Sequence, residues 1–239
     1  MNAPHILYED NHILVVRKQA NQPCAPDSSG DPDLLSILKA DIKERYQKPG
    51  AVYLGLVHRL DRPVEGLMVY ARTSKAAARL SEQIRTHQLF RVYYAVLVRE
   101  NGSIPLEREG ILRDRLEKNS ASNTSYVVTA GGKEAELQYS ILAERDSLIL
   151  VKIRLKTGRS HQIRVQFSSR GYPLFGDARY GHGKPGMQLA LFSGAVCFRH
   201  PTKQETCFFT DLPPARYPFL QFSDEIRNSQ RTLLQELNL

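Results

Sequence analysis

Tryptophan is absent from this 239-residue sequence, and cysteine occurs only three times. The widely spaced thiols Cys24, Cys197 and Cys207 do not make the disulfide framework of a small secreted domain, and they favour a reducing compartment. Cys197 and His200 have a spacing found in metal sites, but no C-x-x-C pair accompanies them. We therefore expect buried or incidental cysteines and no metal.

Long apolar runs and targeting segments are also missing. No stretch is apolar for long enough to cross a bilayer, and the N-terminus has no basic segment followed by an apolar run. The sequence therefore predicts a cytoplasmic protein with no membrane partner. It also lacks internal repeats and obvious linkers, so we expect a single domain over residues 1–239.

Basic residues outnumber acidic ones by 33 to 25, which gives a formal net charge of +8. Lysine and arginine attract polyanions because they neutralise phosphates and release the counterions condensed on them. The charge alone is a weak indication, since many basic proteins bind no nucleic acid.

The apolar pattern changes between strand and helix periods without the regular crossover helices of a parallel sheet. It predicts an α+β fold with a central, mostly antiparallel mixed sheet flanked by helices and loops. Asp31 is expected to cap a helix with Pro32 at its first position, and residues 108–123 are expected to form an exposed, charged excursion. Strands are expected at residues 6–8, 13–16, 66–72, 90–98 and 189–198, a hairpin at 134–157, and further helices at 74–87, 160–170 and 224–239.

Three segments stand out from this pattern. The first, V-H-R-L-D-R-P-V-E-G at residues 57–66, places charged side chains between the apolar runs 52–57 and 67–70. A loop between buried strands is a common way to present catalytic side chains. A charged surface loop with a salt bridge is the alternative, and the residues by themselves favour it.

The second segment is R-V-Y-Y-A-V at residues 91–96, where core packing of the tyrosines is favoured over stacking on a base. The third is T-G-R-S-H-Q-I-R-V at residues 157–165. In it Ser160 is placed to cap a helix that carries Ser160, His161 and Arg164 near one face. Such a helix start suits an anionic ligand. A solvated helix start is the alternative.

Taken together, H-R-L-D, R-V-Y-Y-A-V and G-R-S-H-Q-I-R-V, followed by G-Y-P-L-F-G-D-A-R-Y-G, resemble the RluA-type family of pseudouridine synthases. Their order and rough spacing match that family from about residue 6 to about residue 201. The resemblance implies an isomerase that converts uridine to pseudouridine in structured RNA, either ribosomal or transfer RNA. It implies an active-site cleft across the sheet and no cofactor.

The resemblance also implies a role for each matching position. Asp61 corresponds to the catalytic aspartate, Tyr93 to the tyrosine that packs against the target uracil, and Arg164 to the arginine that pairs with the catalytic carboxylate. Further contacts with the substrate are expected from Arg59, Arg62 and His161.

Three positions depart from the family pattern. Gln19 follows Lys18 where proline is usual, and Arg91 stands where lysine is more usual. Glu65 stands where serine commonly precedes the glycine, and its charge so near Asp61 could alter the fit of RNA. None of the three removes a catalytic group.

One carboxylate suits this reaction. Pseudouridine formation breaks the N1–C1′ bond, turns the uracil and joins its C5 to C1′, so it needs no redox cofactor and no energy donor. The carboxylate acts either as a nucleophile or as the base that removes a ribose proton, and both roles stay open. Glycosidases use two carboxylates because they activate water, whereas here water must be excluded.

Two other functions compete with this one. An RNA-binding module without catalysis would not need Asp61, and a nucleoside hydrolase would need a second acid or a cluster of aspartates. We expect RNA as the partner of a monomer. Only 57 residues precede His58, and the family's opening strands and first helix occupy them, so no separate N-terminal RNA-binding domain is expected.

Overall fold

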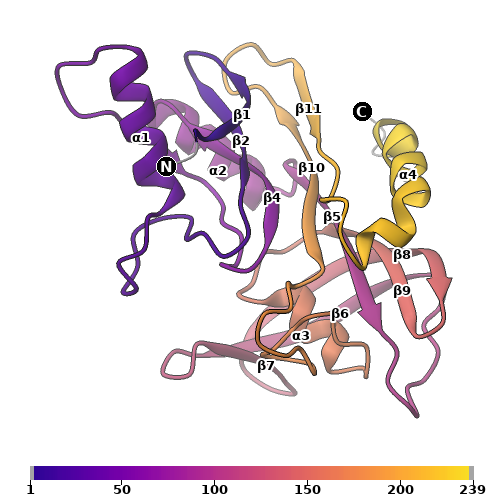
Figure 1. Ribbon diagram of the computed structural model, residues 1–239. Coiled ribbons are helices and arrows are strands. Elements are labelled where there is room, and N and C mark those ends of the chain that lie inside the picture. The colour runs from indigo at the N-terminus through magenta and orange to yellow at the C-terminus, as the bar shows by residue number, and fades with distance from the viewer. Residues whose placement is uncertain (1–2, 237–239) are drawn as a thin grey trace. The chain divides into compact units, whose positions relative to one another are not determined.

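The computed structural model describes residues 3–236, and the chain forms two compact units. Strand β10, Leu191–Arg199, which is labelled in Figure 1, has residues in both of them. Unit 1 comprises Met1–Phe90 and Ala195–Asp211, and unit 2 comprises Arg91–Gly194 and Leu212–Leu239.

Unit 1 contains a small antiparallel sheet with two helices. Its elements are β1 (His5–Glu9), β2 (Ile13–Lys18), α1 (Leu34–Arg45), β3 (Gly55–Leu56), β4 (Glu65–Ala71), α2 (Ser74–Arg85) and β11 (Thr206–Thr210). Strand β2 pairs antiparallel with β1 and with β4. Both β2 and β4 are consecutive apolar runs because side chains on both of their faces are buried. Helix α2 places Ala76 and Leu80 against Ile13, Val15 and Val69.

The first helix begins two residues later than the sequence suggests. Asp33, not Asp31, is the N-cap of α1, and its Oδ1 accepts a hydrogen bond from Ser36 N at 2.9 Å. Asp31 instead forms an ion pair with Arg62. The prediction of Asp31 and Pro32 as the helix start is therefore wrong. The apolar face of α1 is nevertheless buried, through Leu34, Leu38 and Ile42.

Unit 2 contains five antiparallel strands in the order β5-β9-β8-β6-β7. Its elements are β5 (Phe90–Val98), β6 (Glu109–Asn119), β7 (Thr124–Val128), β8 (Lys133–Arg145), β9 (Leu148–Leu155), α3 (Gln162–Ser168), the 3₁₀ turn η1 (Phe219–Phe222) and α4 (Ser223–Glu236). One face of β5 packs Tyr94 and Val96 against Phe222 and Ile226. On the other face, Tyr139 of β8 meets Phe167 of α3 edge to face at 5.6 Å.

Residues 108–123 do not form an irregular excursion. Most of them belong to β6, which pairs with β7 and β8, and Leu112 and Leu116 are buried on one face. The other face carries Arg113, whose Nε donates to Glu136 of β8 at 3.0 Å. The outward face also carries Glu109, Arg115 and Glu117, so most of its side chains are charged. The resulting polar composition makes the alternation of buried and exposed residues hard to recognise in the sequence.

The start of α3 also differs from the prediction. Ser160 does not cap the helix; the N-cap is His161, in the left-handed region at φ 53°, and it makes no capping hydrogen bond. The turn before the helix is instead held by Gln162, whose Oε1 accepts from Arg159 N at 3.0 Å and from Thr157 Oγ1 at 2.7 Å. The helix ends near Gly171, as predicted, with φ 77° at that glycine.

The rest of the predicted pattern is confirmed. The α+β class with antiparallel pairing holds, and every strand and helix expected from the apolar periodicity is present, with shifted ends. The predicted last helix extends to residue 239, and residues 237–239 lie outside those described. All three cysteines are free and buried. Among residues 3–236, no helix combines the length and apolarity needed to cross a membrane.

Candidate active site

The H-R-L-D segment is a loop leading into β4 in unit 1. His58 is buried at its start, and its Nε2 accepts a hydrogen bond from Val69 N at 3.0 Å. At its end, Val64 N donates to the backbone oxygen of Asp61 at 3.0 Å, which closes the turn through Arg62 and Pro63. Asp61 is half-buried. The loop therefore presents the Asp61 carboxylate from backbone that is anchored on a central strand.

Side chains bind the backbone carbonyls on both sides of Asp61. Cys24 Sγ donates to Leu60 O at 3.1 Å, and Lys18 Nζ donates to Arg62 O at 2.9 Å. Burial raises the pKa of the Cys24 thiol, so it stays protonated and able to donate. The sequence indicated neither contact.

Lys18 is fully buried at the end of β2. Its ammonium donates hydrogen bonds both to the loop that follows β2 and to the loop that carries Asp61. Besides Arg62 O, it donates to Gln19 O and Gln22 O, both at 2.8 Å. Burial lowers the pKa of Lys18 to about 8, against the opposing effect of nearby negative groups that include Asp61 and Glu65. The position of Lys18 directly after the apolar run 13–16 and Arg17 was the sequence feature that could have indicated a buried lysine.

Glu65, the departure noted beside Asp61, has a structural partner. Its Oε1 forms an ion pair with Arg17 Nη2 at 2.7 Å, and Arg17 Nη1 also reaches Asp211 at 3.2 Å. Glu65 is buried, so the arginine compensates its charge where water is excluded.

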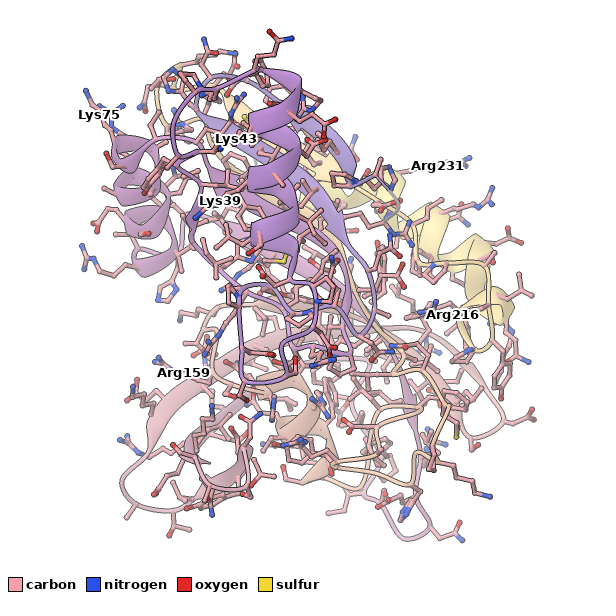
Figure 2. All side chains as sticks on the ribbon, turned by 60° about the vertical axis from the view of Figure 1, so that its left-hand side comes forward. Lys39, Lys43, Lys75, Arg159, Arg216 and Arg231 are labelled. Carbon is pink, nitrogen blue, oxygen red and sulfur yellow. The ribbon has the colours of Figure 1, made fainter. Side chains whose placement is uncertain are left out.

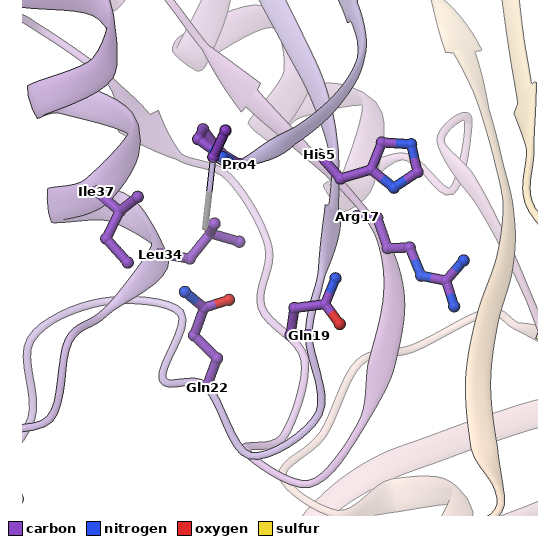
Figure 3. A pocket seen from close by; sticks show the side chains of 8 residues that line it. Pro4, His5, Arg17, Gln19, Gln22, Leu34 and Ile37 are labelled. Atoms are coloured by element: carbon purple, nitrogen blue, oxygen red, sulfur yellow. The ribbon is translucent and has the colours of Figure 1, made fainter. Parts of the chain in front are cut away.

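A cavity of about 250 Å³ lies beside this ion pair, between α1 and the first two strands (Figure 3). Its lining is a mixture of polar and apolar side chains: Ala3, Pro4, His5, Arg17, Gln19, Gln22, Leu34 and Ile37. Gln19 and Gln22 are also the residues whose carbonyls bind Lys18. The cavity therefore lies next to the residues that bind Lys18, and Asp61 is not among its lining residues.

The two arginines that flank Asp61 differ in their surroundings. Arg59 is exposed, and among residues 3–236 it has no hydrogen-bonding or ionic partner. Arg62 donates to Asn21 O at 3.1 Å and forms an ion pair with Asp31. Of the two, only Arg59 presents a guanidinium with all of its donors available.

Tyr93 and Arg164 belong to unit 2, where both are buried. Tyr93 lies opposite Ile153 of β9, and Ile153 lies opposite Tyr139 of β8, so the three side chains share one face of the sheet. Because Tyr139 contacts Phe167, helix α3 packs on that same face. The adjacent Tyr94 faces the other side, where its hydroxyl donates to Ser229 Oγ at 3.3 Å.

Arg164 forms a bidentate salt bridge with Asp177. Its Nε lies 2.7 Å from Oδ2, and its Nη2 lies 2.8 Å from Oδ1. Burial alone would raise the pKa of Asp177, but the Arg164 guanidinium and the N–H groups of Arg179 and Tyr180 lower it below its usual value. The sequence predicted Asp61 as the carboxylate partner of Arg164, and that pairing stays a prediction.

His161 is held by an aromatic partner rather than by solvent. Its Nδ1 lies 2.7 Å from the hydroxyl of Tyr180, and this hydroxyl also accepts from Ser125 N at 2.7 Å. Tyr180 also lies against the Arg164 guanidinium, 5.0 Å from ring centroid to Cζ. The G-D-A-R-Y-G segment thus supplies both Asp177 and Tyr180 to fix the third predicted segment. No cluster of metal-ligating side chains occurs within the described part of the chain.

Solved structures identify the fold class. A human RNA pseudouridylate synthase domain-containing protein, number 4 in its series, superposes with a TM-score of 0.74, covers 93% of each chain and is 21% identical. Number 1 of the series superposes with a TM-score of 0.69 over 91% of this chain and 86% of its own. At these identities the likeness shows the fold alone.

Sequence comparison then identifies the family. The model for RNA pseudouridylate synthase matches residues 12–169, so the chain belongs to that family, and the RluA-type resemblance is confirmed. An uncharacterized RNA pseudouridine synthase of Bacillus subtilis, YhcT, is 33% identical over 84% of this chain and 65% of its own length. The ribosomal large subunit pseudouridine synthase D of Pseudomonas aeruginosa is 36% identical over 74% and 53%. The chain thus spans between half and two thirds of the length of these two relatives.

Proposed function

We propose that this protein converts uridine to pseudouridine in structured RNA, with Asp61 as the catalytic carboxylate. The match of the family model across all three predicted segments carries the proposal. The anchoring of the Asp61 loop supports it further, because a carboxylate that must reach one ribose carbon needs a fixed backbone.

The proposed reaction begins when the target uridine leaves its stack, as it does for other enzymes that modify bases. Asp61 acts at the ribose, the N1–C1′ bond breaks, and the uracil turns so that C5 joins C1′. The proton on C5 is lost and N1 gains one, so the composition of the RNA is unchanged. Tyr93 packs against the uracil while it turns, and Arg164 orients and favours the ionised carboxylate of Asp61.

Arg59, Arg62 and His161 are proposed to contact the RNA around the target. Arg59 is the best-supported RNA contact of the three because its guanidinium is exposed and has no internal partner among residues 3–236. Arg62 would exchange its exposed ion pair with Asp31 for a phosphate at little cost, since such surface pairs contribute little.

The proposed working form is a monomer whose residues 1–239 act as one catalytic domain on ribosomal or transfer RNA in the cytoplasm. Ribosomal RNA is the first choice because several relatives carry ribosomal large subunit names. The three free thiols fit a reducing compartment.

The test uses unmodified ribosomal and transfer RNA transcripts that carry tritium at C5 of uridine. Conversion releases the tritium, because C5 loses its hydrogen, and nuclease digestion then yields pseudouridine. A binding module would leave the RNA unchanged, and a hydrolase would release free uracil. The proposal is contradicted if the RNA that the protein binds in cells stays unchanged, or if that RNA releases free uracil.

A further inference from the structure

Arg91 is a buried cation outside the proposed catalytic residues. It is 6% exposed at the start of the second segment, and within residues 3–236 its guanidinium has neither a hydrogen-bond acceptor nor an anionic partner. Its Nε is completely enclosed. A guanidinium keeps its proton in proteins, and an unpaired buried charge is unfavourable. A negative group brought to this side chain would therefore gain more than one brought to an exposed arginine.

Gly158 lies against the end of this side chain. A Cβ atom at Gly158 would lie 2.8 Å from Arg91 Nη1 and 3.5 Å from Nη2, so only glycine lets the guanidinium reach this position. Gly158 itself is exposed. The terminal nitrogens of Arg91 thus end directly beneath exposed backbone of the T-G-R-S-H-Q-I-R segment, and they join the second predicted segment to the third.

Arg91 also shares a strand face with Tyr93. The two are separated by one residue in a strand whose register with β9 is regular, so their side chains leave the same face roughly 7 Å apart along the chain. That spacing is comparable with the size of one nucleotide. An RNA strand whose base packs on Tyr93 would carry its phosphates at this distance.

We propose that Arg91 binds a backbone phosphate of the RNA substrate beside Gly158. The planar guanidinium can donate two parallel hydrogen bonds to phosphate oxygens, which an ammonium cannot do. The proposal rests on the proposed function for the identity of the ligand as RNA, and on Arg91 and Gly158 for the place where it binds.

The test measures binding alone. The full chain is titrated into a fluorescently labelled single-stranded oligomer of twelve uridines, and the logarithm of the affinity is plotted against that of the salt concentration. Losing one phosphate contact on a single strand should lower the slope by about 0.7. Arg91→Met should show this change with about tenfold weaker binding at low salt. Arg91→Lys should keep the slope and lose part of the affinity.

Two further variants keep the result interpretable. Gly158→Ala retains the charge but displaces the guanidinium, so it should weaken binding and lower the slope even if Arg91→Met does not fold. Arg145→Met is the matched control, because Arg145 is exposed and already paired with Glu225 at 2.6 Å, and it should bind with the unaltered slope.

Unchanged affinity and slope in both folded Arg91→Met and Gly158→Ala would overturn the phosphate site. Tritium release by the unaltered protein is scored separately. Tritium release by the unaltered protein, together with unchanged salt slopes in the variants, rejects the phosphate site but not the proposed enzymatic function. A changed slope without any release supports the site and rejects the enzymatic function.

Discussion

At the scale of single residues, the support of Asp61 comes from side chains that do no chemistry themselves. Lys18 and Cys24 bind the carbonyls of Arg62 and Leu60, the residues on either side of Asp61. A misplacement of about 1 Å at a catalytic group can lower a rate about 100-fold. Residues that fix the backbone can therefore matter nearly as much as the carboxylate.

Lys18→Met should lower the single-turnover rate about 10- to 100-fold and leave RNA affinity nearly unchanged, because Lys18 is fully buried and touches no solvent. Rapid-quench measurement of pseudouridine at saturating protein, beside a binding titration, separates the two quantities. Lys75→Met, on the exposed surface of α2, is the control and should keep the rate. A normal rate in folded Lys18→Met would show that the ammonium does not position Asp61.

The Arg164–Asp177 pair should contribute strongly to stability because both side chains are almost inaccessible, at 6% and 1%. Asp177→Asn removes the bidentate carboxylate partner of a buried guanidinium, which should lower the free energy of unfolding by about 3–5 kcal/mol. Urea unfolding measures this change. Glu82→Gln breaks the exposed pair with Arg85 and should cause no measurable change. A loss below about 1 kcal/mol for Asp177→Asn would mean that the site relaxes around the arginine.

At the scale of elements, α1 offers a direct comparison between the cap expected from the sequence and the cap observed. Asp33→Ala removes the acceptor for Ser36 N and should lower the free energy of unfolding by about 1 kcal/mol. Asp31→Ala removes only an exposed ion pair and should change it by less than about 0.5 kcal/mol. Chemical denaturation of the two variants measures both. The opposite order would restore Asp31 as the effective cap.

The elements also show where sequence periodicity succeeds. Strands β2, β4 and β5 were predictable because long apolar runs between polar turns can only be buried. Strand β6 was not, because its outward charges are neutralised by Glu134 and Glu136 of β8, about twenty residues further along the chain. A periodicity analysis over a short stretch of sequence cannot detect ion pairs between residues this far apart.

The site was predictable in part for the same reason. The motif residues were found from short contiguous segments, whereas their supports come from distant positions. Lys18 lies 44 residues before Arg62, whose carbonyl it binds beside Asp61, and Asp177 lies 13 residues after Arg164. Neither pairing can be read from the sequence, because a buried polar group can meet any complementary group that the fold brings close.

At the scale of the whole molecule, the net charge of +8 should make RNA binding depend strongly on salt. Lys39 and Lys43 project from α1, and Lys75 lies on α2 (Figure 2). If about four phosphates are neutralised, affinity should fall roughly 50-fold between about 50 and 200 mM salt. Filter binding measures this. An affinity that hardly changes over that range would exclude phosphate contacts as the main attraction.

The central claim is that Asp61 performs the chemistry. Asp61→Asn keeps the size and hydrogen-bonding shape of the side chain and removes its charge. The most direct measurement is the pseudouridine yield of Asp61→Asn on the RNA that the unaltered protein modifies, beside a binding curve for that RNA. No detectable pseudouridine, with affinity equal or slightly higher because repulsion from phosphate is lost, is the expected result. Near-normal turnover by Asp61→Asn would contradict the mechanism.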